Sequence, residues 1–424
     1  MERRKKRKRN NFSSNFIFIF LINFIYAYSV FYFMIVLGIE STAHTFGIGI
    51  VKDGKILSNV KKMYITETGG IIPLEAAKHH FQNKNEIYFE ALANAKIKDS
   101  ELRNSGQSKN YKKFFDEEDI DAIAFSQGPG LSPCLLEGLR FAKELGNKIK
   151  KPIVPVNHCI AHLEIGKITG AKDPVMLYCS GANTQIIAYA SGKYRIFGET
   201  LDIGVGNFID TFARYAGIGF PGGPVIQRLV EENKEKNYVE LPYKVKGMDV
   251  AFSGILTNLK QKIEKMNNLP AHLHSQIDKN LMKETTDKSF IKSSNKFRAS
   301  DSERGNSYTL ADLAYSLQET VFAMLVETAE RALAHTGKKE LLLGGGVACN
   351  KRLQEMCRVM CSEREEKVKL FIPENSLLTD NGAMIAFLGE IMFLKGIKVS
   401  YKDLDKLDIM PRQRTDDVEV GWKN

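Results

Sequence analysis

From residue 34 onward, the pattern of hydrophobic and polar positions predicts short buried strands that alternate with amphipathic helices. Apolar runs bounded by turn residues predict strands at 35–40, 46–51, 56–60, 120–125, 152–156, 174–178, 186–190 and 340–343. Segments with a helical period predict helices at 74–95, 134–149, 311–336 and 351–360. Two polar segments lack any period, so we expect a surface loop at 98–119 and a flexible insertion at 267–307.

A strand–turn–strand unit occurs once in each half of the chain. The first includes residues 39–45, and residues 179–185 with their flanking strands echo it. A hairpin turn with hydroxyl groups and free backbone N–H groups can hold a phosphate. Two such hairpins form an internal repeat, the layout of the actin/hexokinase/Hsp70 (ASKHA) nucleotide-binding fold. We therefore expect an α/β protein with two lobes, at 34–155 and 156–424.

The residues before this pattern are of a different kind. Residues 2–9 carry seven Lys/Arg and one Glu, and residues 16–37 are almost unbroken Phe, Ile, Leu, Tyr and Val. The apolar run is long enough to span a bilayer, but its end overlaps the first predicted strand. A start at Met34 would resolve the overlap, so we interpret residues 1–33 as a dispensable extension, with a membrane anchor as the alternative.

Composition narrows the class of protein only slightly. The net charge of +10 includes +6 from residues 2–9, so the remainder is mildly basic, which is compatible with a nucleic-acid partner. The six cysteines show no disulfide spacing, and we expect reduced thiols in a cytoplasmic protein.

Two histidines give the clearest chemical signal. His158 and His162 follow the strand 152–156, with Asn157 as a predicted N-cap. On a helix, residues four apart lie on one face and can bind one metal ion. A core histidine beside a surface histidine is the alternative, because two ligands do not complete a metal site. The nearby Gly-rich turn 126–132 favours an anion and close packing about equally.

Several longer motifs stand in a fixed order along the chain: IVLGIESTAHTFGIGIV, GGIIPLEAAKHH, SQGPGLSPCLLEGLRFAK, PVNHCIAHLEIG, YCSGANTQ, FIDTFAR, GFPGGP, LLLGGGVACNKRLQEM, TDNGAMIA and RQRTDDVEV. From Met34 to about Trp422 the chain resembles the universal tRNA N6-adenosine threonylcarbamoyltransferase family, in its archaeal and eukaryotic-cytosolic form.

The resemblance implies one divalent metal ion, iron or zinc, in a cleft between the lobes. It implies ligation by His158, His162 and Asp380, with Tyr178 at the metal. For Asp380 alone, a helix N-cap before residues 381–383 is the alternative.

The resemblance also implies a site for threonylcarbamoyl-AMP, which ATP or AMP can occupy. The implied binding residues are Tyr178, Cys179, Ser180, Gly181 and Ala182 at the phosphate and acyl part, and Asp210, Gly223, Gln227 and Asn350 at the ribose and base. Gln227 stands where the family usually has Glu, and an amide cannot accept two ribose hydroxyl bonds as a carboxylate can.

By resemblance, the chain transfers a threonylcarbamoyl group to N6 of the adenosine next to the anticodon of tRNA. It would work as the catalytic subunit of a KEOPS-type complex, with a small atypical kinase and a dimerising subunit. We assign no catalytic side chain. No membrane partner is expected unless residues 16–37 form an anchor.

Two other functions were weighed against the residues. An ATP-binding regulatory protein or kinase of the same fold is the main alternative, but sugar kinases need an Asp that the hairpin 40–50 lacks. A zinc protease would need Glu directly after the first histidine, where Cys159 stands.

Overall fold

A computed structural model describes residues 34–66, 70–104, 116–267, 299–300 and 307–423. The basic tail, residues 16–33 of the apolar run and most of the predicted insertion at 267–307 lie outside these residues, whereas the end of the apolar run belongs to the described chain. Among the described helices, none combines the length and apolar character needed to cross a bilayer.

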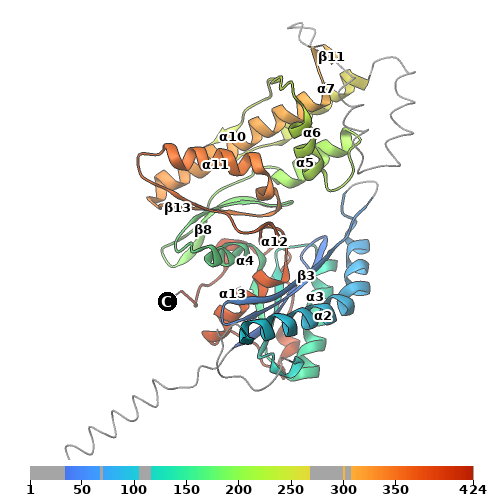
Figure 1. Cartoon of the computed structure of the whole chain (residues 1–424), viewed down its shortest axis with the longest axis vertical. Helices are drawn as coiled ribbons and strands as arrows, with labels where there is room; N and C mark the ends of the chain where they lie inside the picture. The colour runs from blue at the N-terminus through green and yellow to red at the C-terminus, as the bar shows by residue number, and fades with distance from the viewer. Residues whose placement is uncertain (1–33, 67–69, 105–115, 268–298, 301–306, 424) are drawn as a thin grey trace, which may run out of the picture. The chain divides into compact units, whose positions relative to one another are not determined.

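Five strands form the first sheet, in the order β3-β2-β1-β4-β5. Figure 1 labels its edge strand β3. β1, β2 and β3 pair antiparallel, whereas β4 and β5 continue parallel to β1. The bounds are β1 Ile35–Glu40, β2 Thr45–Lys52, β3 Lys55–Met63, β4 Ala122–Gly128 and β5 Ile153–Asn157.

The second sheet repeats this topology, in the order β14-β13-β6-β7-β8. Here β6, β7 and β8 pair antiparallel, and β13 and β14 continue parallel to β6. The bounds are β6 Val175–Cys179, β7 Thr184–Ala190, β8 Lys193–Glu199, β13 Glu340–Gly344 and β14 Lys369–Phe371. The repeat expected from the two hairpins, and with it the α/β fold class, is confirmed.

Helices cover both sheets and connect their strands. Those of the described chain are α2 Pro73–Asn104, α3 Ser132–Ile149, α4 His158–Glu164, α5 Val205–Tyr215, α6 Gly222–Glu232, α7 Ser253–Asn267, α10 Leu310–Thr336, α11 Lys351–Glu363, α12 Asn375–Leu378 and α13 Gly382–Leu394. Two-residue strands form the small pairs β9 Val245–Lys246 with β10 Asp249–Val250, and β11 Ala299–Ser300 with β12 Ser307–Tyr308.

The loop prediction at 98–119 is wrong at its start, because α2 continues to Asn104. The extension is held by an ion pair: Asp99 is buried, and its carboxylate lies 2.7 Å from Nζ of Lys52 on β2. A buried ion pair leaves no hydrophobic period, so the sequence pattern does not reveal this part of the helix.

The first sheet is covered on its second face by a helix from the far end of the chain. Ile35, Leu37 and Ile39 of β1 face α2 and α3, whereas the alternate residues Val36 and Gly38 face α13. The glycines permit this approach, because a Cβ at Gly49 would lie 2.2 Å from the backbone nitrogen of Ala383. The lobe boundary expected at residue 155 falls within β5, and α13, from the expected second lobe, packs on the first sheet.

Candidate metal centre

The short helix α4 carries both histidines at the end of β5. Asn157 is its N-cap, and the side-chain Oδ1 accepts a hydrogen bond of 3.1 Å from the N–H of Ile160. All residues of α4 are buried, so His158 and His162 lie inside the protein rather than on its surface. Their rings stand edge to face with centroids 4.8 Å apart, as the four-residue spacing predicts.

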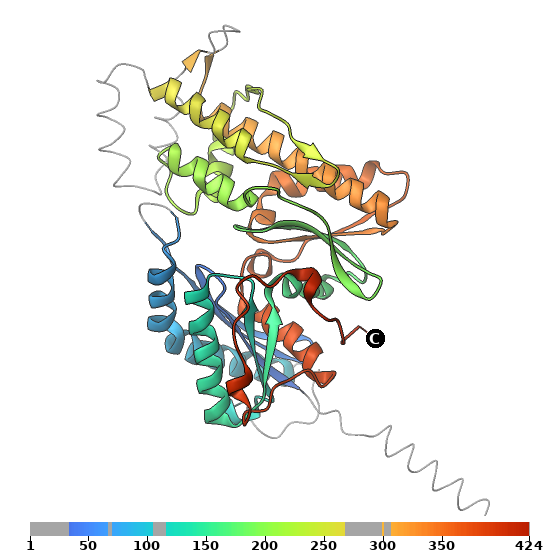
Figure 2. The same ribbon diagram turned by 180° about the vertical axis from the view of Figure 1, so that it is seen from behind.

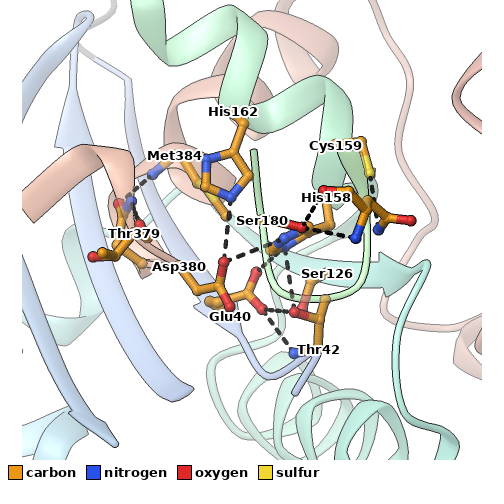
Figure 3. A network of polar contacts seen from close by, with 12 residues as sticks. Glu40, Thr42, Ser126, His158, Cys159, His162, Ser180, Thr379, Asp380 and Met384 are labelled. Carbon is orange, nitrogen blue, oxygen red and sulfur yellow. Dashed lines mark hydrogen bonds and ion pairs between the residues drawn. The ribbon is translucent and has the colours of Figure 1, made fainter. Parts of the chain in front are cut away.

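Asp380 reaches the histidines because its neighbour caps the next helix. Asn381, not Asp380, is the N-cap of α13, and its Oδ1 accepts from the N–H of Met384 at 3.0 Å. Nδ2 of Asn381 also donates to the carbonyl of Thr379 at 2.8 Å, which fixes the turn before the helix. The capping alternative for Asp380 is therefore wrong, and its carboxylate is left to face α4 (Figure 3).

Three ligand atoms converge at one point. Asp380 Oδ1 lies 3.4 Å from His158 Nε2 and 3.3 Å from His162 Nε2. Nitrogen and oxygen ligands bonded tetrahedrally to one zinc ion are roughly 3.3–3.4 Å apart. These are the only His, Cys, Asp or Glu residues within the described ranges that cluster in a way that could hold a metal. The donor set and its spacing fit the metal that the resemblance implies.

Glu40, at the end of β1, orients the first histidine from behind. Its carboxylate is fully buried and lies 2.9 Å from Nδ1 of His158. Thr42 donates to the same carboxylate through its backbone N–H at 2.7 Å and through its hydroxyl at 2.5 Å. With a proton on Nδ1, Nε2 of His158 presents its lone pair toward Asp380, the arrangement common behind metal-bound histidines.

Electrostatics favour a positive charge at this point. Burial lowers the pKa of His158, but the nearby carboxylates of Glu40 and Asp380 outweigh it and raise that pKa well above its usual value. Burial alone would raise the pKa of Asp380, yet the two histidines hold it well below its usual range. Burial lowers the pKa of His162. A cation bound at this position would replace the proton that the two carboxylates otherwise hold on His158.

Tyr178 lies beside the histidines. Successive residues of β6 face opposite sides, so Leu177 enters the core of the second lobe whereas Tyr178 turns toward α4. The ring centroids of Tyr178 and His162 are 5.0 Å apart. The hydroxyl of Tyr178 is buried and has no hydrogen-bond partner among the described residues. A buried polar atom is rarely left unpaired, so this hydroxyl fits a further contact with the implied metal or its ligand.

The turn after β6 is the second part of the predicted site. The backbone N–H of Ser180 is already used, because it donates to the carbonyl of Asn183 at 2.9 Å. The carbonyls of Ser180 and Gly181 accept from the first turn of α5. Within the described chain, the N–H groups of Gly181 and Ala182 have no acceptor, and they remain able to bind a negative oxygen.

Cys179 contributes to this turn through its backbone only. Its side chain is fully buried in the hydrophobic core of the second lobe, where burial raises the pKa of the thiol well above its usual value. Cys159 is buried as well.

Two of the residues expected at the ribose and base, Asp210 and Gln227, already have hydrogen-bond partners within the protein. The carboxylate of Asp210 accepts from the N–H of Gly222 at 2.9 Å, next to Gly223, where an added Cβ would meet open space. Gln227 lies on α6, where its Nε2 donates to Glu231 at 2.9 Å, and its Oε1 accepts from the N–H of Lys351 at the start of α11 at 3.3 Å.

Asn350 has structural partners of its own. Its Oδ1 caps α11 by accepting from the N–H groups of Arg352 and Leu353, and its Nδ2 donates to Gln318 at 2.7 Å. A ligand at this end of the site would therefore replace existing bonds of Gln227 and Asn350.

The Gly-rich turn 126–132 is explained by close packing. A Cβ at Gly128 would lie 1.9 Å from the carbonyl oxygen of Met410, and one at Gly130 would lie 2.5 Å from that of Thr42. Of the two alternatives left open by the sequence, these contacts favour packing over an anion site.

Two supporting residues were not predicted from the sequence. Glu40 was interpreted as part of a strand, although a carboxylate in a buried strand is itself a signal of a partner. Lys61 on β3 was also missed; its Nζ contacts the hydroxyl of Thr379 and lies 3.1 Å from the carbonyl of Asp380. Lys61 thus ties the Asp380 turn to the first sheet, a contact between residues 319 apart in sequence.

Comparison with known proteins identifies the family. The family model described as tRNA N6-adenosine threonylcarbamoyltransferase matches residues 113–387. A tRNA N6-adenosine threonylcarbamoyltransferase of Thermococcus sibiricus is 46% identical over 92% of this chain and 100% of its own length. A probable tRNA N6-adenosine threonylcarbamoyltransferase of Drosophila melanogaster is 43% identical, covering 92% of this chain and 99% of its own.

A longer relative and a solved structure are also similar to this chain. A probable bifunctional tRNA threonylcarbamoyladenosine biosynthesis protein of Methanocaldococcus jannaschii is 45% identical over 92% of this chain and 60% of its own length. The crystal structure of HypF from T. kodakarensis, 14% identical, superposes with a TM-score of 0.50 over 88% of this chain and 49% of that one, a likeness of fold alone. The resemblance expected from the motifs is confirmed, and the chain belongs to the tRNA N6-adenosine threonylcarbamoyltransferase family.

Proposed function

We propose that this chain transfers a threonylcarbamoyl group from threonylcarbamoyl-AMP to N6 of the adenosine next to the anticodon, in tRNAs that read codons beginning with A. Family membership over nearly the whole chain supports the reaction class. The observation that carries the proposal is the convergence of His158, His162 and Asp380 beside a turn with two free N–H groups.

One divalent ion, iron or zinc, would be held by His158, His162 and Asp380, with Tyr178 alongside. When bound, such an ion supplies Lewis acidity toward a carbonyl or phosphoryl oxygen. Glu40 and Thr42 hold the ring of His158 so that Nε2 faces the ion, and Lys61 and Asn381 hold the turn that carries Asp380.

The residues of the second lobe would bind and orient the activated substrate. The N–H groups of Gly181 and Ala182 would donate to the oxygen that gains negative charge as the amine attacks the carbamoyl carbon. The new bond joins N6 to that carbon, and the bond between the carbon and the phosphate oxygen breaks. AMP leaves with the electron pair, and the proton released from the amine balances the charge on its phosphate.

We propose that the chain acts on tRNA within a KEOPS-type complex that includes a small atypical kinase and a dimerising subunit. The support for this assembly is the resemblance to the archaeal and eukaryotic form of the family. ATP or AMP would occupy the same site as the adenylate, next to Asp210, Gly223, Gln227 and Asn350.

The test uses cells whose own gene for this transferase has been removed. Wild-type chain should restore threonylcarbamoyl-adenosine in digested tRNA, measured by mass spectrometry, whereas His158→Ala should not. His335→Ala is the matched control, because His335 is an exposed histidine on α10. Restoration by His158→Ala, or failure of the wild type in the presence of its partner subunits, would contradict the proposal.

A further inference from the structure

The motif RQRTDDVEV near the C-terminus has no part in the site described above, yet the segment that contains it runs along the metal-carrying helix. Before the motif, the N–H of Met410 donates to the carbonyl of Gln127 at 2.8 Å, and Gln127 Nε2 donates to the carbonyl of Asp408 at 2.9 Å. These contacts attach the segment to the end of β4. Figure 2 shows it, in dark red, passing from the first sheet toward β8.

The segment first meets α4 at the helix N-terminus. Oε1 of Gln413 accepts a hydrogen bond of 3.0 Å from Nδ2 of Asn157. Because an amide has one donor end and one acceptor end, this bond turns Oδ1 of Asn157 toward the N–H of Ile160, which it caps. Gln413 therefore fixes the cap that begins the helix, one residue before His158.

Past this point the segment is anchored to the second lobe. The turn η5 (Thr415–Asp417) packs against β8 and buries Thr415. The guanidinium of Arg414 lies 3.4 Å from the carboxylate of Glu199 at the end of β8. The chain thus passes from the first lobe to the second beside α4.

The segment meets α4 again at the helix C-terminus. Glu164, the last residue of α4, has a fully buried carboxylate that accepts from the hydroxyl of Tyr194 and pairs with Lys167. Nζ of Lys423 lies 3.4 Å from the same carboxylate, and 4.3 and 4.8 Å from the ring centroids of Tyr189 and Tyr194. Lys423 is thereby desolvated and held over two aromatic faces, a favourable place for an ammonium group.

We propose that residues 411–423 form a brace that holds both ends of α4 and so sets the separation of the two histidine ligands, with Gln413 and Lys423 as positioning residues. The brace does not touch the metal ligands, and it acts through Asn157 and Glu164. The role of α4 as a carrier of metal ligands rests on the proposed function. The bracing of the helix rests on the contacts described above.

A physical reason for such a brace lies in the length of the helix. A helix of seven residues is too short to be stable by itself, and its ends would fray without outside contacts. His158 is its first residue and Glu164 follows His162 by two positions, so fraying at either end would move a ligand. Ligands held loosely by about 1 Å are the usual cause of a weak site.

The test measures metal binding by the purified full-length chain after its metal has been removed with a chelator. Lys423→Met keeps the apolar stem and removes the ammonium group, and Lys402→Met makes the same change at an exposed lysine of the C-terminal region. We expect Lys423→Met to bind Zn²⁺ about tenfold more weakly than Lys402→Met. Amide hydrogen exchange at residues 158–164 should be faster in the same variant.

Two further variants make the result independent of any one substitution. Lys423→Arg keeps the cation and should restore metal affinity, whereas Gln413→Leu removes the acceptor for Asn157 and should weaken binding from the other end of the helix. Equal affinities for Lys423→Met, Gln413→Leu and Lys402→Met, or unchanged exchange at 158–164, would overturn the brace. Neither readout uses tRNA, so a failed modification assay would not affect this result.

Discussion

Glu40 ends the first strand of the first sheet, and Cys179 ends the corresponding strand of the second. The Glu40 side chain is buried and bonded to Thr42 and His158, so this hairpin serves the metal ligands. Cys179 is followed by a turn whose Gly181 and Ala182 N–H groups have no acceptor in the described structure, so this hairpin is open to a ligand.

The two hairpins share one topology, but their ends have different contacts. In the first half, α13 packs on β1 and β2, and the carboxylate of Glu40 at the end of β1 contacts His158. In the second half, β6 places Tyr178 against His162 of α4 and ends in the turn with the two free N–H groups, where we propose that substrate binds. Variants in the first half should change metal binding, and variants in the second should change turnover.

The largest effect is expected from Glu40→Gln. The amide can donate to Nδ1 of His158 and so favour the wrong tautomer, which turns the lone pair away from Asp380. Metal affinity should fall about 10- to 100-fold. Isothermal titration of the metal-free protein would measure it, with Glu366→Gln on the surface as control. Unchanged affinity would show that Glu40 does not orient the histidine.

Gly181→Val tests the turn that follows β6 in the second sheet. A Cβ at this position would meet only Oδ1 of Asn207, 3.5 Å away, so the fold should tolerate the side chain. The side chain would stand where substrate approaches the free N–H groups, and turnover should fall roughly 10- to 100-fold. Steady-state kinetics with tRNA would measure this loss, while metal affinity should match the wild type. Loss of metal with loss of turnover would break the division between the halves.

Gly49→Val tests whether close packing of α13 places Asp380. The new side chain would clash with the backbone of Ala383, so the helix must shift at a cost of about 1–3 kcal/mol. Metal affinity should fall about tenfold, because the turn of Asp380 moves with the helix. Gly254→Ala, where an added Cβ meets open space, is the control, and both values come from denaturation and metal titration. A destabilised protein with normal metal affinity would contradict this placement.

The smallest effect on metal binding should come from Glu390, which lies on α13 and contacts the Gly54 turn rather than the metal ligands. Its Oε2 accepts from the N–H of Gly54 at 2.8 Å, and burial raises its pKa to about 7. The folded protein therefore keeps a proton that the unfolded chain releases near its ordinary pKa of 4.5, and stability falls as pH rises from about 4.5 to about 7.

Glu390→Gln removes this dependence and keeps the acceptor for Gly54. The variant should be more stable than the wild type by on the order of 1–3 kcal/mol at about pH 8, with the difference shrinking toward about pH 5. Urea denaturation at a series of pH values would measure it. A difference that does not change with pH would argue against a buried protonated carboxyl.

The features that the sequence predicted are mostly local. The Asn157 cap and the histidine spacing are contained in a few consecutive residues, and the two hairpins repeat a visible pattern. Asp380 is different, because it lies 218 residues beyond His162 and only the family resemblance linked them. The contacts of Lys61 and of the C-terminal segment were missed for the same reason: they join distant residues and leave no period.

The sequence pattern did not predict the end of α2 or the packing of α13 on the first sheet, and the physical reasons can be named. Asp99 extends α2 through one buried ion pair, which a hydrophobic pattern does not record. α13 is apolar nearly all round, so its sequence indicates burial but not which sheet it covers. The helix packs on the first sheet because Gly38 and Gly49 have no side chains that would clash with its backbone.

The central claim is that His158, His162 and Asp380 bind one metal ion. Anomalous diffraction from crystals of the zinc-loaded or iron-loaded chain, measured on both sides of the absorption edge, tests it most directly. The account predicts one peak per chain, within about 2.0–2.2 Å of Nε2 of both histidines and an oxygen of Asp380. A fully loaded protein whose only peak lies elsewhere would contradict it.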